Sequence, residues 1–511
     1  MDTEKTPPPA VEPWHRSRML LRNPVSLAGV ALGIVALSNI FIFVLIDNIA
    51  IKPSPYVGIL AYMVSPGFLI LGLLMMLAGI LLERRKHLAP SAFYPRLDLN
   101  DPTQRSAVIS FMTFLVVFVV VSAAGSYKAY EFTESTAFCG QLCHTVMIPE
   151  YTAYQLSPHA RVACAECHVG TGATWFVKSK LSGSRQVFAT IFNTYPRPIP
   201  TPVHNLRPAQ ETCEQCHWPK KFYGGQLKIF NHYANDEKNT LHRVQMLIKT
   251  GGGDPATGAP EGIHWHMNIG NRIDYLAADE KRQVIPYIHV EDLQGRVTEY
   301  YAKDSALTKD QIKAAIAKGE THHMDCVDCH NRPTHIYVPP DQSVDQLLAA
   351  RRLDVSLPFI KQQAVTVLSA TYKTNDEAMR AIATGLQGFY ESKYPDVAKS
   401  KQLEIRNAVN EIQLVYGRTT FPDMKLNWET HPNNLGHYYY PGCFRCHDGQ
   451  HVSSDGRVIS RDCNQCHTMM SETEGTASAT PPPPPTFQHP VDLGDLTQVN
   501  CADCHTGGVG P

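Results

Sequence analysis

Three long apolar runs without charged residues lie in the first quarter of the chain, at residues 25–46, 57–82 and 107–125. A helix rises about 1.5 Å per residue, so about 20 residues cover the roughly 30 Å hydrocarbon core of a bilayer. Each run therefore predicts a membrane-spanning helix, with a kink at Pro66 in the second. The first run is longer than the apolar stretch of a signal peptide, and no small-residue cleavage site follows it, which favours a retained anchor.

Positive charge is distributed unevenly around these runs. The flanking basic residues lie before the first run or between the second and third: Lys5, Arg16, Arg18, Arg22, Arg84, Arg85, Lys86, Arg96 and Arg105. The loop between the first and second runs has only Lys52. Because loops rich in Lys and Arg stay in the cytoplasm, residues 1–24 are predicted to form a cytoplasmic arm. The chain beyond the three-helix anchor at 25–126 is then predicted to lie on the opposite side.

Beyond the anchor, the spacing of hydrophobic positions changes. Short apolar runs at 222–320 predict a β-rich insertion, with a hairpin formed by residues 283–290 and 295–301. At 341–430, apolar residues recur at three- and four-residue steps, which predicts a helical segment. Residues 471–488 include five consecutive prolines and are typical of a semi-rigid spacer. The expected fold class is three transmembrane helices followed by a mainly α, loop-rich domain with a small β-rich insertion.

All 14 cysteines fall into seven pairs, and a histidine directly follows every pair. The pairs are Cys139 and Cys143, Cys164 and Cys167, Cys213 and Cys216, Cys326 and Cys329, Cys443 and Cys446, Cys463 and Cys466, and Cys501 and Cys504. The histidines are His144, His168, His217, His330, His447, His467 and His505. With 23 histidines in 511 residues, chance placement after all seven pairs has a probability on the order of one in a billion.

This motif is typical of c-type haem attachment, in which two thiols bind the porphyrin covalently and the adjacent histidine ligates the iron. We therefore expect a membrane-anchored multihaem cytochrome with seven covalently bound haems, the first attached through a C-x-x-x-C-H motif. Disulfides would not require the histidine. Zinc ribbons use two C-x-x-C pairs for each metal, and seven pairs do not divide evenly.

A low-spin haem needs a second axial ligand from elsewhere in the chain. The candidates close to the motifs are His159, His204, His322, His323, His335, His437, His451 and His489. His264 and His266 lie two residues apart on an expected strand and would face the same side. One of them could ligate a haem while the other supports it or contacts a propionate. Met147 could either ligate haem 1 or pack against its edge.

The motif positions divide the part of the chain beyond the anchor. The expected segments are a domain with haems 1–3 at 127–221, the β-rich insertion at 222–320, haem 4 at 321–340, the haem-free helical segment at 341–430, haems 5 and 6 at 431–470, the spacer at 471–488 and haem 7 at 489–511.

Charge narrows the choice of partners. A formal net charge of −1 excludes a basic nucleic-acid binder as the default interpretation. Residues 167–210 contain no Asp or Glu but do contain Lys178, Lys180 and Arg185, interleaved with apolar residues. This pattern predicts a basic amphipathic helix in the headgroup region, in contact with anionic lipid. A solvated surface helix is the alternative.

Residues 107–221 resemble the NapC/NirT family of membrane-anchored multihaem quinol dehydrogenases. The resemblance implies that Lys178 or Lys180 helps to hold the quinol oxygen and that Met147 or an open site faces the quinol at haem 1. The chain departs from the family in its longer first motif, in the absence of an acidic residue soon after the lysines, and in its three spans and seven haems. The proton acceptor stays open among Glu131, Glu134, Glu150 and water. The larger layout is similar to seven-haem inner-membrane cytochromes of metal-respiring bacteria.

We therefore expect a bacterial inner-membrane enzyme with a cytoplasmic N-terminus and a periplasmic haem domain. It would oxidise menaquinol near haem 1 and relay electrons to a periplasmic c-type cytochrome or reductase in anaerobic respiration, with extracellular metal as one end point. Two alternatives stay open: a terminal reductase of a small oxyanion, and a wiring subunit without its own quinol site. Homo-oligomer formation also stays open.

Overall fold

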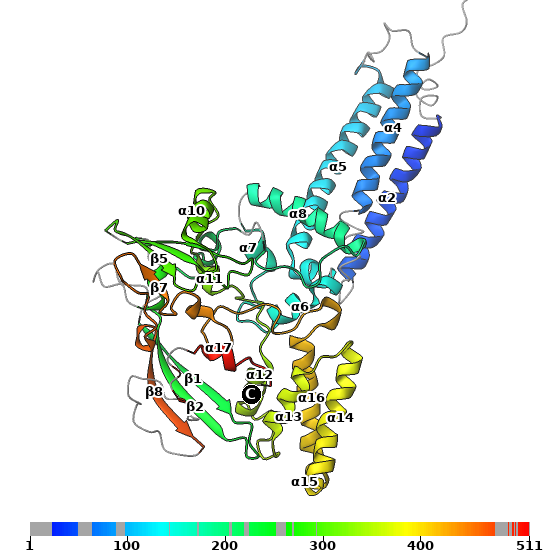
Figure 1. The fold of residues 1–511 in the computed structure, drawn as a ribbon. Coiled ribbons are helices and arrows are strands. Elements are labelled where there is room, and N and C mark those ends of the chain that lie inside the picture. The colour runs from blue at the N-terminus through cyan, green and yellow to red at the C-terminus, as the bar shows by residue number, and fades with distance from the viewer. Residues whose placement is uncertain are drawn as a thin grey trace, which may run out of the picture. The chain divides into compact units, whose positions relative to one another are not determined.

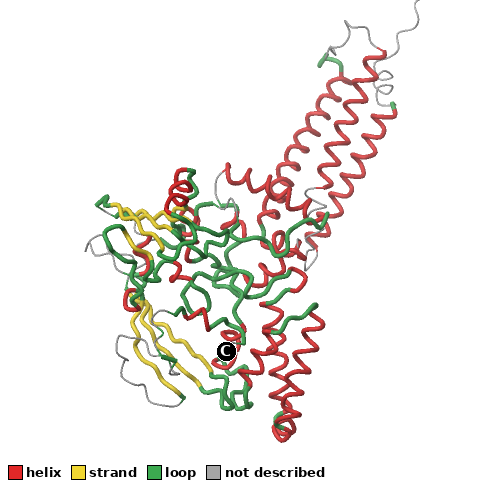
Figure 2. Tube along the Cα trace, viewed as in Figure 1, coloured by secondary structure: helices red, strands yellow, loops and turns green. Residues whose placement is uncertain are grey.

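A computed structural model describes residues 23–49, 64–87, 98–142, 144–170, 173–203, 207–218, 224–251, 262–267, 270–292, 294–475 and 499–509, and residues 489, 493, 494 and 496. The chain divides into two compact units, Met1–His144 and Thr145–Pro511. Figures 1 and 2 show the helices and strands of both units.

The first unit is helical. Its elements are α2 (Pro24–Ile49), α4 (Ser65–His87), α5 (Pro102–Glu134) and the π-helical turn η3 (Phe138–Leu142). Glycines let α2 and α4 approach each other closely. A Cβ on Gly72 would lie only 2.8 Å from the Gly29 carbonyl oxygen, so a larger residue would not fit there. Asn23 Nδ2 also donates to the Gly79 carbonyl across this contact, at 3.0 Å. Close backbone approach through small residues is typical of helix pairs in membranes.

Two helices in the described part of the chain are long and apolar enough to cross a membrane, where the sequence predicts three. The qualifying segments are Pro24–Phe43 and Ser65–Glu83, and only 17% of each apolar window is buried. This exposure distinguishes them from the core helices of a soluble protein. The third predicted span, 107–125, lies inside the longer helix α5. Pro66 is the second residue of α4, a first-turn position at which proline removes no intrahelical hydrogen bond, so the reason for the predicted kink does not apply there.

The second unit is mainly helical with many loops. Its helices are α6 (His144–Gln155), α7 (Cys164–His168), α8 (Ala173–Ile191), α9 (Ala209–Cys213), α10 (Lys309–Ala317), α11 (Cys326–Cys329), α12 (Pro340–Ala349), α13 (Ile360–Ser369), α14 (Asn375–Lys393), α15 (Pro395–Ser400), α16 (Gln402–Thr419) and α17 (Cys501–Cys504). Short 3₁₀ turns are η5 (Ile263–Met267), η6 (Pro422–Met424), η7 (Gly442–Arg445) and η8 (Cys463–Gln465).

Among the described residues, eight strands form two antiparallel sheets. The strands are β1 (Gly225–Tyr233), β2 (Leu241–Lys249), β3 (Arg272–Leu276), β4 (Tyr287–Glu291), β5 (Val297–Ala302), β6 (His322–His323), β7 (His451–Ser453) and β8 (His467–Glu474). The sheet orders are β1-β2-β8 and β6-β3-β4-β5-β7. The expected hairpin is present, with Ile288 opposite Tyr300 in β4 and β5. β8 occupies the start of the predicted proline-rich spacer, and residues 476–488 lie outside the described part.

Helices α12, α13, α14 and α16 form a bundle around one apolar core. Leu386, Tyr390 and Ile412 are fully buried in it. Apolar periodicity at residues 344–353, 376–390 and 400–416 predicts α12, α14 and α16. It does not reveal α13, which follows Phe359 in a left-handed conformation. The buried ammonium of Lys361 pairs with Asp341 at 2.6 Å and with Asp345 at 2.5 Å. Two carboxylates thus compensate the one charge inside this region.

Candidate haem sites

The first cysteine of each pair lies in a short helical turn. In α11, the side chain of Asp325 caps the first turn, and the side chain of Asp328 reaches back to the Asp325 backbone amide. One helical turn separates Cys326 from Cys329, and residues three apart share a helix face. Both thiols can therefore reach one porphyrin edge. Among the residues that the structure describes, no group of three or more Cys, His, Asp and Glu side chains is placed to hold a metal ion.

In the part of the chain whose side chains are described, six motif histidines each face a second histidine ring. Two imidazoles that share one metal, each with a bond of about 2 Å, have ring centroids about 6 Å apart. The observed pairs and centroid distances are His168 and His335 at 6.2 Å, His217 and His159 at 6.0 Å, His330 and His264 at 6.4 Å, His447 and His266 at 5.9 Å, His467 and His437 at 6.1 Å, and His505 and His489 at 6.1 Å. The spacing therefore fits an iron between the rings of every pair.

The family models agree with this geometry. The N-terminal region of the NapC/NirT cytochrome c family matches residues 101–199, and cytochrome c3 matches residues 437–508. The cytochrome c-type protein ImcH of Geobacter sulfurreducens is 46% identical to the chain over 503 residues, which cover 96% of this chain and 98% of that protein. The chain belongs to the ImcH family of c-type cytochromes. No solved structure matches it significantly.

As an ImcH-family member, the chain is an electron-transfer protein with multiple c-type haems. The NapC/NirT family groups quinol-oxidising electron carriers, and the match covers α5 to the end of α8. When bound, the haem irons accept and donate single electrons. The apolar helices near the N-terminus indicate membrane anchoring.

Backbone contacts fix the rings in the tautomer that a metal requires. The Nδ1 atoms of four paired histidines lie against carbonyl oxygens: His264 and Thr250 at 2.6 Å, His266 and Ile263 at 2.7 Å, His335 and Glu150 at 3.1 Å, and His447 and Ser460 at 2.9 Å. An Nδ1–H that donates to a carbonyl leaves the Nε2 lone pair free for the iron.

Burial also keeps these rings neutral. Desolvation is the largest cause of a lowered pKa at eight of the paired histidines, because it disfavours the imidazolium. They are His168, His266, His330, His335, His437, His447, His467 and His505. A neutral imidazole is the form that ligates a metal.

Three other candidate ligands do not face a motif histidine. His451 is 1% exposed, and both its ring nitrogens are engaged, Nδ1 with Asp448 at 2.9 Å and Nε2 with the Ile285 carbonyl at 2.7 Å. The prediction that His451 is a ligand is therefore wrong. His323 pairs with Asp274 at 2.9 Å, and His322 lies against the Tyr275 ring, so neither joins a pair. His204 lies outside the described residues.

The expectation that His264 and His266 share a strand face is also wrong. They lie in the 3₁₀ turn η5, where side chains two positions apart point about 120° apart. Each ring therefore faces a different motif, His330 or His447.

Haem 1 differs from the other six sites. Cys139 lies in η3, while Cys143 and the His144 side chain lie outside the described residues. Met147 packs against an apolar cluster that includes Val146, Phe421 and Trp428. Its role as a ligand stays a prediction.

Consecutive motifs are neighbours in space from haem 2 to haem 7. In each step, one thiol lies close enough to a thiol of the next motif to interact electrostatically or by a hydrogen bond. The neighbouring thiols are Cys167 and Cys213, Cys213 and Cys326, Cys329 and Cys443, Cys443 and Cys466, and Cys463 and Cys501. In the described part of the chain, each motif from haem 2 to haem 6 therefore has a thiol near a thiol of the next motif in the sequence.

The basic segment after haem 2 is helical, as predicted. Helix α8 exposes large apolar side chains, including Leu181 at 70% and Phe188 at 63%. Lys178 Nζ lies over the Trp175 ring, 4.6 Å from its centroid, in a cation–π contact. The structure thus provides an amphipathic helix with its lysines on an exposed element.

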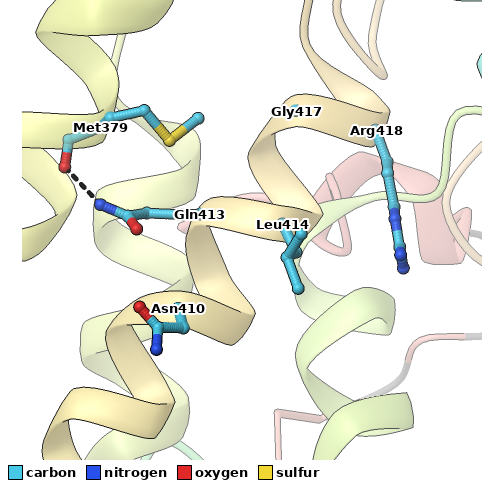
Figure 3. Close-up of a pocket in the computed structure, with 6 residues that line it drawn as sticks. All are labelled: Met379, Asn410, Gln413, Leu414, Gly417 and Arg418. Atoms are coloured by element: carbon cyan, nitrogen blue, oxygen red, sulfur yellow. Dashed lines mark hydrogen bonds between the residues drawn. The ribbon is translucent and has the colours of Figure 1, made fainter.

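The hollow on the bundle offers no haem site. Figure 3 shows it between α14 and α16, where Gln413 Nε2 donates to the Met379 carbonyl at 2.7 Å. The lining residues are Met379, Asn410, Gln413, Leu414, Gly417 and Arg418. This lining contains neither Cys nor His.

Proposed function

We propose that the chain is a bacterial inner-membrane quinol dehydrogenase that oxidises menaquinol near haem 1. Electrons would pass through seven c-type haems to a periplasmic cytochrome or reductase. The observation that carries this proposal is the set of six histidine pairs, two of which have one ring, His159 or His168, inside the NapC/NirT-like region at 101–199. ImcH, the relative that spans nearly the whole chain, is itself a cytochrome c-type protein.

The residues at haems 2–7 favour relay over substrate reduction. Two histidines on opposite sides of an iron occupy both axial positions and leave no position for an oxyanion. The Nδ1 contacts hold these rings in place, as at His266 and His335. Histidine pairing at six sites therefore supports a carrier of electrons rather than a terminal reductase.

The quinol site is proposed at haem 1, whose motif follows α5 after a short connection. Quinol oxidation releases two electrons and two protons. An ammonium beside the quinol oxygen favours its deprotonation, because an opposite charge stabilises the anion. Lys178 or Lys180 is proposed for that role, and Met147 as the second ligand of haem 1. The proton acceptor stays open among Glu131, Glu134, Glu150 and water, because Glu131 pairs with Lys128 just as Glu150 pairs with Arg332 and His335.

The anchor is proposed to have three spans, with α5 as the third, a cytoplasmic N-terminus and a periplasmic haem domain. The exposed apolar side chains of α8 support its contact with anionic lipid. Electron exit is proposed at haems 5–7, the end of the motif series. A soluble c-type cytochrome or reductase would dock there weakly and in a salt-sensitive manner.

Anaerobic mixing of the purified protein with a reduced menaquinone analogue, followed by haem absorbance, tests the proposal. We expect rapid haem reduction and about tenfold slower reduction in Lys178→Gln or Lys180→Gln, equivalent to roughly 1.4 kcal/mol. Lys399→Gln, on the exposed surface of α15, is the matched control and should leave the rate unchanged.

Two outcomes favour the alternatives. Unchanged reduction rates in both lysine variants would indicate a wiring subunit without its own quinol site. A high-spin ferric signal from a haem other than haem 1 would instead support a terminal reductase.

A further inference from the structure

We propose that haems 4 and 5 form one fixed, electrostatically coupled pair, held by the turn Ile263–Met267 and by Arg445. This inference rests on the haem loading of the proposed function but not on quinol oxidation. The residues that carry it lie largely between the two segments matched by family models, 101–199 and 437–508.

One short turn provides a ring to each of the two motifs. His264 lies 6.4 Å from the haem 4 histidine, His330, with ring planes 1° apart. His266 lies 5.9 Å from the haem 5 histidine, His447, with ring planes 88° apart. Because Nδ1 of both turn histidines contacts a carbonyl oxygen, neither ring can rotate without losing that contact. The turn therefore fixes the two proposed irons relative to each other.

The residues beside these rings also join the two motifs. Met267 Sδ lies 4.0 Å from Sγ of Cys326, in the haem 4 motif. Trp265 packs edge-on against His266, 5.7 Å between centroids, and belongs to the apolar cluster that includes Cys446 of the haem 5 motif. The whole turn is thus packed between the two attachment sites.

Arg445, inside the haem 5 motif, clamps the haem 4 motif. Its guanidinium donates to the Asp328 carbonyl at 2.7 Å, to the Arg282 carbonyl at 2.8 Å and to the Gly442 carbonyl at 2.9 Å. Asp328 stands between Cys326 and Cys329, so this contact links the backbones of both motifs. Its carboxylate accepts from Tyr275 at 2.5 Å and Arg282 at 2.9 Å, which fixes the motif from the other side.

The guanidinium places a permanent positive charge between the two motifs. A positive charge stabilises the reduced form of any nearby redox centre relative to its oxidised form, and the effect is large where water is excluded. Arg445 is therefore a positioning residue that raises the midpoint potentials of both haems. The two haems are also coupled by electrostatics, because an electron added to one haem disfavours the addition of an electron to the other.

The ring planes provide a separate spectroscopic signature. Perpendicular imidazoles leave two iron d orbitals nearly degenerate and give a highly anisotropic EPR signal with a large maximum g value. Parallel imidazoles split these orbitals and give an ordinary rhombic signal. Haem 5 is expected in the first class and haem 4 in the second. The 75° pair of His159 and His217 predicts a second large-g signal at haem 3.

Ligand variants of the full-length holoprotein test the turn. His266→Met should remove one large-g signal, and His264→Met one rhombic signal. Each variant should add one near-infrared band of a His–Met haem and shift the potential of the other haem of the pair. His489→Met, at haem 7, is the matched control and should leave both potentials unchanged. A variant of the turn that alters no ferric signal, or that leaves the second potential unchanged, would overturn the pair.

Redox titration of Arg445 variants tests the clamp. Arg445→Gln should lower two midpoint potentials, whereas Arg445→Lys, which keeps the charge, should restore them in large part. Arg352→Gln breaks an Arg–Glu ion pair in the haem-free bundle and should shift neither. Covalent haem content by mass spectrometry reports whether each variant has matured. A shift of one potential or none in Arg445→Gln would refute the coupling. Absence of bis-histidine signals in the unmodified protein would instead refute the proposed haem sites.

Discussion

At the scale of single residues, the contact made by Nε2 distinguishes a candidate ligand from a structural histidine, because Nδ1 contacts an oxygen in both kinds. In His266, one nitrogen contacts a carbonyl and the other ring edge faces a second imidazole. In His451, two oxygen acceptors occupy both nitrogens, so both nitrogens must carry protons. The same side chain is thus suited to ligate a metal in one setting and to hold a proton on each nitrogen in the other.

His451 makes stability depend on pH. Burial lowers its pKa, but the hydrogen bonds to Asp448 and to the Ile285 carbonyl outweigh burial and raise the pKa overall. The stabilisation is therefore fully present below the unfolded pKa and is lost as pH rises through the folded pKa. We expect His451→Gln to lose about 2 kcal/mol at low pH and little at high pH. Thermal unfolding across this range measures the difference, and an equal loss at both ends would contradict the charged form.

Lys361 is the second residue whose charge affects the free energy of unfolding. Lys361→Met leaves Asp341 and Asp345 without their buried counter-charge, and breaking such a pair costs about 3–5 kcal/mol. We expect this loss in denaturant unfolding followed by circular dichroism. Lys399→Met, on the surface, should change the free energy of unfolding by less than about 0.5 kcal/mol. A small effect of Lys361→Met would mean that water reaches this site.

At the scale of elements, the contact between α2 and α4 depends on glycines, which have no Cβ. A leucine at Gly72 would place its Cβ 2.8 Å from the backbone of α2, so the helices would have to separate. We expect Gly72→Leu to lower the thermal midpoint of the first unit in detergent. Gly67→Leu, whose Cβ would meet nothing within 4 Å, is the control on the same helix. Equal midpoints for the two variants would contradict the observed packing.

At the scale of the whole molecule, the sequence predicts what local chemistry dictates. Covalent attachment needs two thiols and a histidine on one turn, so the motifs are readable without a fold. Alternation and three- to four-residue periodicity likewise predict the β4–β5 hairpin and helices α14 and α16. Axial pairing is different, because the second histidine comes from another part of the fold. No spacing rule therefore separates His335, which faces His168, from His451, which does not face a motif.

The residues that the sequence analysis did not predict are also ones whose role depends on contacts between distant parts of the fold. Arg445 and Asp328 lie between the two cysteines of their motifs, at positions that the motif does not specify. Only the fold brings them together. An arginine in one motif and an aspartate in another are the only signals that the sequence offers. The assignment of His264 and His266 to a strand fails because a 3₁₀ turn of five residues has no periodicity to detect.

Removal of His335 tests whether the six pairs are independent. His335→Met should convert haem 2 alone to His–Met coordination, because its ring contacts His168 and Glu150. Magnetic circular dichroism in the near infrared should show one changed haem and the others unaltered. Changes at several haems would indicate that Glu150 and Arg332 support more than one site.

His335 also stands apart in its position along the chain. For five of the six pairs, the facing histidine precedes its attachment motif, but His335 follows His168 after the motifs of haems 3 and 4. During synthesis from the N-terminus, haem 2 would thus be attached long before its second ligand exists. A nascent chain halted before residue 335 should carry a five-coordinate, carbon monoxide-binding haem 2, and elongation past that residue should close the site.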